Sequence, residues 1–210
     1  MTTKNIIFVL VFLFSFGLFF WSCRNLFRYM MVAKKKDDRF GDVGRRIGNV
    51  LKIAFGQSKL LRDPAAGIVH FLIFWGFILF LFAVVEAIIQ GFYSPFNLEF
   101  LGPVYSLITL VQDIFGVLVI LAVIAALLRR YVFAIPRLQV DKAASLDATV
   151  ILLLILIVVV SMFIQNSAAI AKSNFILAEY EVRPISAFLS QLFFSDSSTG
   201  AVITFEIAWM

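Results

Sequence analysis

The chain has 210 residues, of which 62% are hydrophobic, and its mean hydropathy is +0.99. This composition indicates an integral membrane protein and excludes a soluble globular domain. The one cysteine, Cys23, cannot supply a disulfide framework or a four-thiolate cluster, and one cysteine with one histidine excludes an ordinary zinc site. The net charge of +5 does not indicate nucleic-acid binding, because the basic residues gather in loops beside the apolar segments.

The first apolar segment covers residues 6–20, and helical character is expected to continue to Met31. A secretory signal peptide would have a short apolar core followed by small residues at a cleavage site. Here the bulky aromatic residues Phe19–Trp21 stand directly before Ser22 and Cys23. We therefore predict a retained first transmembrane helix.

Residues 33–59 change composition abruptly and are rich in lysine and arginine. Apolar residues recur there at spacings of three and four, which predicts a short amphipathic helix on the membrane surface: Ile47, Val50, Leu51, Ala54 and Phe55. Membrane topology and contact with lipid headgroups alone would explain the positive charge. A sharper interpretation adds that some of these cations neutralise the carboxylates of a cofactor, with Arg62 closest in sequence to the histidine of the next span.

The second apolar segment, residues 65–90, contains the only histidine of the sequence, His70. An Asp-Pro pair at 63–64 opens it, as a helix N-cap followed by a first-turn proline would. The segment is long enough to cross a hydrocarbon core of about 30 Å. His70 is either a ligand for a functional group or a structural hydrogen-bonding group near the interface. Gly67 and Gly76 are expected to leave room beside the helix for something flat and bulky.

Two further spans are predicted at about residues 105–128 and 148–169. Residues 172–199 are mixed and polar, with a short interfacial helix expected over 185–194. The ten residues 201–210 then begin a fifth apolar stretch that covers only about half of a bilayer. Such an end is typical of a truncated chain, and the alternative is a tail that lies flat at the interface.

The distribution of basic residues predicts the orientation in the membrane. Fifteen of the eighteen lysine and arginine residues lie between the first and second spans or between the third and fourth. The positive-inside rule therefore places the 32–64 loop in the cytoplasm, and the amino terminus and the 172–199 loop outside. His70 is then expected near the cytoplasmic face. The predicted fold class is an all-α membrane helix bundle of four complete transmembrane helices and the start of a fifth.

Six other polar residues within the predicted spans are candidates for a functional role: Glu86, Gln90, Gln112, Asp113, Gln165 and Asn166. In this topology all six lie in the outer half of the membrane, and Asp113 is expected to be buried. In one interpretation Glu86 and Gln90 are interfacial and Asp113 is a hydrogen-bonding group in helix packing. In the functional alternative, Asp113 and Glu86 relay protons beside a quinone pocket. Cys23 and Met162 are expected to pack against other side chains rather than to bind metal.

The order of the spans, the sequence DPAAGIVHFLIFWGF at the second span and RRYVFAIPRL after the third resemble the nitrate reductase gamma-subunit-like membrane domain. More closely, the whole chain resembles the amino-terminal domain of heterodisulfide-reductase-like iron–sulfur oxidoreductases, including the electron-transfer-flavoprotein:menaquinone type. The resemblance implies one membrane domain over residues 1–210, in a bacterial cytoplasmic membrane, that continues beyond Met210.

In that family the histidine of the second helix is an axial ligand of haem b. The resemblance therefore implies that His70 binds haem iron, with Gly67 and Gly76 beside the porphyrin and Arg62 near a propionate. The gamma subunit of nitrate reductase holds two haems and has a second histidine further outward, which this span lacks, so one haem is expected. The partner histidine would come from the fifth helix, and the iron–sulfur domains of the family would follow it; neither lies within residues 1–210.

The resemblance implies the haem b membrane domain of a respiratory iron–sulfur oxidoreductase. It would pass electrons between cytoplasmic iron–sulfur domains, or an electron-transfer flavoprotein, and a quinone in the lipid. The alternative hypothesis is a cofactor-free membrane anchor that recruits a cytoplasmic partner through Lys34–Lys36 and Arg45–Arg46. A transporter is disfavoured because neither an inverted repeat nor an interrupted helix pair is visible.

Overall fold

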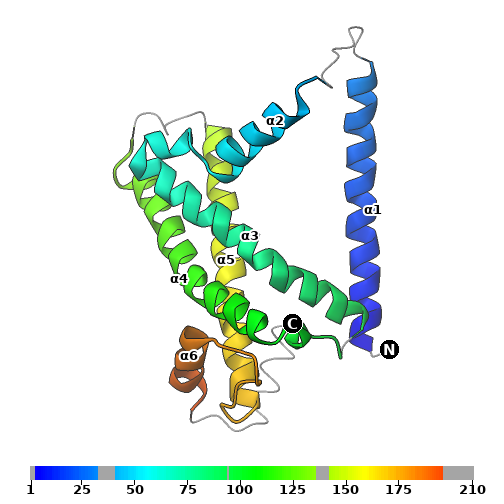
Figure 1. Ribbon diagram of the computed structural model, residues 1–210, viewed down its shortest axis with the longest axis vertical. Helices are drawn as coiled ribbons and strands as arrows, with labels where there is room; N and C mark the ends of the chain where they lie inside the picture. Colours follow the sequence, from blue (N-terminus) through cyan, green and yellow to red (C-terminus); the bar gives the residue numbers. More distant parts are fainter. Residues whose placement is uncertain (1–2, 33–40, 94, 136–141, 196–210) are drawn as a thin grey trace. The chain divides into compact units, whose positions relative to one another are not determined.

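The computed structural model of the protein describes residues 3–32, 41–93, 95–135 and 142–195, and every regular element in these ranges is helical (Figure 1). Four helices are long and apolar enough to cross a membrane: α1 (Thr3–Met31), α3 (Pro64–Phe92), α4 (Pro103–Tyr131) and α5 (Lys142–Lys172). The predicted all-α, multi-pass membrane fold is therefore confirmed. The expected start of a fifth span, at 201–210, lies outside the described residues.

Shorter helices connect these spans. The predicted short helix is found as α2 (Val43–Asn49) continued by the π-helix η1 (Val50–Phe55), and nearly all of its residues are exposed. Its position on the membrane surface stays a prediction. The expected interfacial helix is α6 (Pro184–Phe194). Two single turns of 3-10 helix, η2 (Leu60–Arg62) and η3 (Glu99–Leu101), precede α3 and α4.

The chain divides into two compact units. Unit 1 comprises residues 1–56 and 83–97, and unit 2 comprises residues 57–82 and 98–210, so the helix α3 belongs to both.

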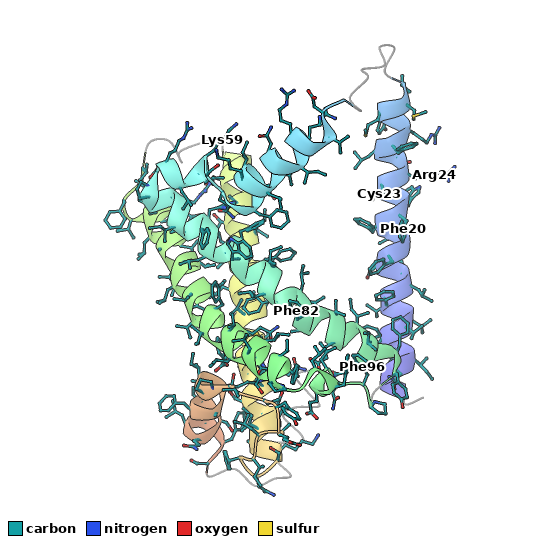
Figure 2. The ribbon with its side chains drawn as sticks, in the orientation of Figure 1. Phe20, Cys23, Arg24, Lys59, Phe82 and Phe96 are labelled. Carbon is teal, nitrogen blue, oxygen red and sulfur yellow. The ribbon has the colours of Figure 1, made fainter. Side chains whose placement is uncertain are left out.

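Within unit 1, polar and aromatic contacts join α1 to the end of α3. The Asn5 side-chain amide donates to the carbonyl of Gly91 at 2.8 Å. The rings of Phe8 and Phe12 meet Phe92 edge to face, with centroids 5.6 and 5.2 Å away. The rest of α1 is mostly exposed; Figure 2 shows Phe20, Cys23 and Arg24 on it. An exposed apolar helix of this length suits contact with lipid tails.

Unit 2 is built around α4, which packs against α5 and α6 (Figure 1). Its core consists of Val119 and Val123 of α4 with Val159 and Phe163 of α5. Gly116 makes this contact close, because a Cβ there would lie 2.6 Å from the Phe163 ring.

The first part of α3 joins unit 2 through one polar and one apolar contact with α4. The Gln112 side-chain amide donates to the Leu79 carbonyl at 3.0 Å. Beside Gly76, the position of a missing Cβ is taken by the Val119 side chain. Small residues that let helices approach closely are typical of membrane helix packing.

The beginning of α3 is fixed by the turn before it. The predicted N-cap is confirmed, since Asp63 Oδ1 accepts a hydrogen bond from the Ala66 amide at 3.4 Å. A Cβ on Gly67 would lie 2.5 Å from the Leu60 carbonyl oxygen and 2.8 Å from Leu61 Cα. These neighbours are backbone atoms, so the turn rests directly on the helix and a side chain at Gly67 would require the turn to shift.

We predict that Gly67→Ala destabilises the protein by about 1–3 kcal/mol, because the new methyl group forces the turn away from α3. The measurement is the unfolding midpoint in detergent. Gly17→Ala is the matched control, since nothing lies within 4 Å of a Cβ at that exposed helix position. It should be neutral or slightly stabilising. Equal midpoints for the two variants would contradict the close contact at Gly67.

Candidate functional site

His70 lies near the start of α3 with its side chain exposed. Its Nδ1 is 3.0 Å from Oε1 of Gln57, a residue of the turn that precedes the helix. The ring of Phe74, one helical turn further on, is nearly parallel to the imidazole at an angle of 14° and a centroid distance of 6.4 Å. The imidazole is thus held at one nitrogen, while the ring remains accessible.

The partner of the histidine is itself buried. Gln57 is only 1% exposed and has a positive φ of 47°. Its carbonyl accepts hydrogen bonds from the amides of Leu60 and Leu61, at 3.0 and 3.1 Å. Its side-chain Nε2 is also buried and has no hydrogen-bond partner among the described residues. A buried amide donor without a partner is rare enough to call for an explanation.

An apolar face of α3 continues from the histidine. Positions four, seven and eleven residues along a helix share one face, and these are Phe74, Phe77 and Leu81. Phe77 and Leu81 are exposed and Phe74 is half-buried. A flat apolar group bound at His70 would find a matching surface there.

Basic residues lie at the same end of unit 2. Lys59 and Arg62 are exposed in the turn before α3, and Figure 2 marks Lys59 there. Arg129 and Arg130 stand in the last turn of α4. Figure 1 shows that α3 begins and α4 ends on this side of the unit. The end of the unit that carries His70 is therefore rimmed by positive charge that can attract carboxylates or phosphates.

These residues fit an iron porphyrin better than a bare metal ion. A histidine that donates Nδ1–H to a carbonyl oxygen keeps a lone pair on Nε2, which is the arrangement of a metal-binding imidazole. No group of three or more His, Cys, Asp or Glu side chains that could hold a metal ion occurs in the described part of the chain. An iron porphyrin brings its own four nitrogen ligands, so His70 would be the contribution of these residues to such a group.

The space beside the two glycines is filled by the protein itself. Gly67 and Gly76 are both buried, against the Leu60–Leu61 backbone and the Val119 side chain respectively. We expected both glycines to leave space beside the helix for a bulky group. The structure shows instead that neighbouring protein atoms fill this space. A direct contact of either glycine with a cofactor stays a prediction.

Asp113 has a clear structural role at the other end of unit 2. It is fully buried in α4, and its carboxyl oxygens accept hydrogen bonds from the amides of Ile185 and Ser186, at 2.6 and 3.2 Å, and from Ser186 Oγ at 2.5 Å. Asp113 thus caps the beginning of α6 from a neighbouring helix, where the free amides and the helix dipole favour an acceptor. Ser167 Oγ of α5 donates to the Ser186 carbonyl at 3.0 Å and completes the junction.

A proton-relay role for Asp113 and Glu86 stays a prediction. Glu86 is half-buried on α3 within unit 1, and Asp113 belongs to unit 2.

Two more hydrogen bonds tie the segment between α5 and α6 to α4. The Val182 amide donates to Thr109 Oγ1 at 3.0 Å, and Ser106 Oγ donates to the Tyr180 carbonyl at 3.1 Å. In the same segment, a hydrogen bond to Glu179 and repulsion by its carboxylate raise the pKa of the Tyr180 phenol above its usual 10.0. The phenol therefore stays neutral over the physiological pH range.

A cavity of about 400 Å³ lies beside the carboxyl-terminal turns of α5. Its polar lining comes from Asn166, Ser173, Glu181 and Arg183. Arg183 is buried and its Nε donates to Glu181 Oε1 at 3.3 Å. The side-chain Nδ2 of Asn166 is buried without a partner among the described residues. The cavity thus combines apolar walls with donors that a small polar head group can use.

Sequence reasoning identified His70 and Asp113 but missed their partners. Gln57 stands between Gly56 and Ser58 in a segment marked only by its positive charge, and no period or motif singles it out. The partners of Asp113 lie 72 and 73 residues away in a helix predicted as interfacial. One indication that Asp113 caps a helix was present in the sequence: a short helix that begins with a proline follows it later in the chain.

Comparison with known proteins gives two relatives. The chain is 31% identical over 209 residues to the probable iron–sulfur-binding oxidoreductase FadF of Bacillus subtilis, covering 97% of this chain and 28% of FadF. It is 31% identical over 159 residues to the EtfAB:quinone oxidoreductase of Syntrophomonas wolfei, covering 75% of this chain and 21% of that protein. The chain is therefore homologous to the amino-terminal region of both and spans about a quarter of their length. No family model and no solved structure matches it.

We predict that Asp113→Leu lowers the free energy of unfolding by about 1–3 kcal/mol, because the amides at the start of α6 lose their acceptor in a buried place. Thermal unfolding in detergent measures the change. Asp147→Asn, at an exposed position of α5, is the control and should be neutral. The capping role would be refuted by an Asp113→Leu protein as stable as the control.

Proposed function

We propose that the chain is the haem b-binding membrane portion of a quinone-linked iron–sulfur oxidoreductase in a bacterial cytoplasmic membrane. The homology to FadF and to the EtfAB:quinone oxidoreductase supports the oxidoreductase class. The observation that carries the haem proposal is the geometry of His70. It lies exposed at the start of a membrane-length helix, with Nδ1 bonded to a buried amide and an apolar face of aromatic residues beside it.

In this proposal His70 holds the iron through Nε2, and Phe74 and Phe77 lie against the porphyrin. Arg62 and Lys59 neutralise the propionates, as exposed cations at the rim of a membrane site can. Bound haem supplies reversible one-electron transfer, with a potential set by its ligands and by the burial around it. Residues 1–210 contain one imidazole, so they would supply one histidine ligand to the iron.

The partners follow from the relatives. The names of the two relatives refer to iron–sulfur binding, to EtfAB and to quinone. This chain has one cysteine and cannot hold an iron–sulfur cluster alone. We therefore place the clusters in a continuation of the chain or in a partner, with an electron-transfer flavoprotein as the soluble redox partner and a membrane quinone on the other side.

The cavity beside α5 is our proposed position for the quinone head group. Its volume of about 400 Å³ falls within the usual range of small-molecule sites. The carbonyl oxygens of a quinone accept hydrogen bonds, and the unpartnered Nδ2 of Asn166 is a donor in need of an acceptor. Arg183, which is paired with Glu181 at 3.3 Å, has further guanidinium N–H groups that a quinone carbonyl can use as donors.

We predict that membranes containing the chain show a reduced b-type spectrum when haem is available, and that His70→Ala abolishes it. The sequence holds no other histidine, so no other imidazole of this chain can take over the iron. Ile68→Ala, an exposed substitution two residues away, should keep the spectrum. An unchanged spectrum in His70→Ala would exclude His70 as the ligand. Colourless membranes from the unsubstituted protein would leave the cofactor-free anchor, whose Lys34–Lys36 lie outside the described residues.

For the quinone site, Asn166→Leu should weaken binding of a short-chain naphthoquinone about tenfold, as loss of one buried hydrogen bond does. Equilibrium binding to the protein in nanodiscs measures this affinity. Gln165→Leu, its exposed neighbour on α5, is the control and should bind as the unsubstituted protein does. If both variants bind equally well, the quinone does not use this cavity.

A further inference from the structure

We infer that Gln57 is the positioning residue of His70, because it fixes the imidazole tautomer that leaves Nε2 free to bind iron. The inference rests on the proposed haem function and goes one step beyond it, to a residue outside the helix that carries the ligand. Its basis is the 3.0 Å contact between His70 Nδ1 and Gln57 Oε1 together with the burial of Gln57.

The turn before α3 holds the Gln57 side chain in place. The backbone carbonyl of Gln57 accepts two amide hydrogen bonds, from Leu60 and Leu61. The same two residues rest against Gly67 of α3 without room for a side chain between them. Because both the turn and the helix are fixed at this contact, Gln57 has little freedom to move relative to His70.

The chemistry of the contact decides which ring nitrogen is free. An amide oxygen only accepts, so a neutral imidazole facing it carries its proton on Nδ1 and a lone pair on Nε2. An acceptor on the far nitrogen also makes the ring a stronger electron donor to a metal. The opposite orientation of the amide would donate to Nδ1 and place the proton on Nε2, and Nε2 would then have no lone pair for iron. The tautomer of His70 is therefore the quantity to measure.

The backbone of the turn does not itself call for a glutamine at position 57. The φ of 47° at Gln57 lies in the left-handed region, which glycine adopts without steric cost and glutamine rarely adopts. A residue kept in such a conformation points to a constraint from its surroundings. Gln57→Gly should therefore preserve or improve the turn while it removes the hydrogen bond to His70.

The first experiment measures the tautomer in the full 210-residue chain in nanodiscs before haem is added. Labelling histidine with ¹⁵N gives the signals of one ring, because the chain has one histidine. We expect the Nδ1–H form in the unsubstituted protein and a shift toward the Nε2–H form in Gln57→Gly. Asn174→Gly relieves an equally left-handed backbone, with φ of 55°, far along the sequence and should leave the tautomer unchanged. An Nε2–H ring in the unsubstituted protein, or no change in Gln57→Gly, overturns the inference.

The second experiment measures haem affinity and the midpoint potential of the bound haem. Gln57→Gly should bind haem about 10- to 100-fold more weakly, which is typical when a residue that orients a metal ligand is lost. Gln57→Glu offers a stronger acceptor, so it should retain the spectrum and shift the midpoint to a lower value. If Gln57 had only a structural role, its substitution would lower the stability of the protein, and Gln57→Glu would not lower the midpoint potential of the haem. Equal affinity and potential in all three proteins would overturn the inference.

The two proposals fail in different ways. If His70→Ala keeps the haem spectrum, the iron ligand is elsewhere and the proposed function fails at His70. If His70→Ala loses the spectrum while Gln57→Gly binds haem as tightly as Asn174→Gly does, His70 is the ligand and Gln57 does not position it.

Discussion

A hydrocarbon solvent offers no hydrogen bonds, and this constraint organises the polar residues of the chain. A polar group that enters a span is stabilised when it finds its partner within the protein. Asn5 and Gln112 both donate to backbone carbonyls of α3, and Asp113 accepts from the first amides of α6. Each of these side chains therefore fixes one helix against another at a defined height. Apolar contacts such as those of Val119 and Phe163 fill the space between the helices, but they would allow one helix to slide along another.

Within unit 2, Asp113 and His70 use polar groups differently. At the end with α6, the carboxyl group of Asp113 and the hydroxyl of Ser186 are satisfied by each other and by backbone amides. At the end with His70, the described residues satisfy one ring nitrogen and leave an amide donor of Gln57 unpartnered. The first arrangement is what a structural junction requires. The second is what a site that awaits another group would look like.

The spans and the short helix at 185–194 could be predicted from the sequence because apolar length and Pro-initiated starts are local signals. The burial of Asp113 could also be predicted, since an acid within an apolar helix has few other options. Its partners could not, because they are fixed by how α6 folds back on α4. The packing at Gly67 and Gly76 could not be predicted either. A glycine in a helix allows another group to approach closely, but the sequence does not say whether that group is a cofactor, a turn or a valine.

The contact between Gln57 and His70 also bears on the structural alternative for the histidine. A histidine that served only to join two helices would be expected to reach across to another span, as Asn5 and Gln112 do. His70 instead bonds to the turn before its own helix, so the hydrogen bond adds nothing to the packing of one span against another. It holds the ring itself. The left-handed backbone at Gln57 and the close backbone contact at Gly67 cost folding free energy, which holding one exposed ring would not by itself offset. The cost is offset if an oriented Nε2 binds a metal, since the bond energy then stabilises the folded turn as well as the complex.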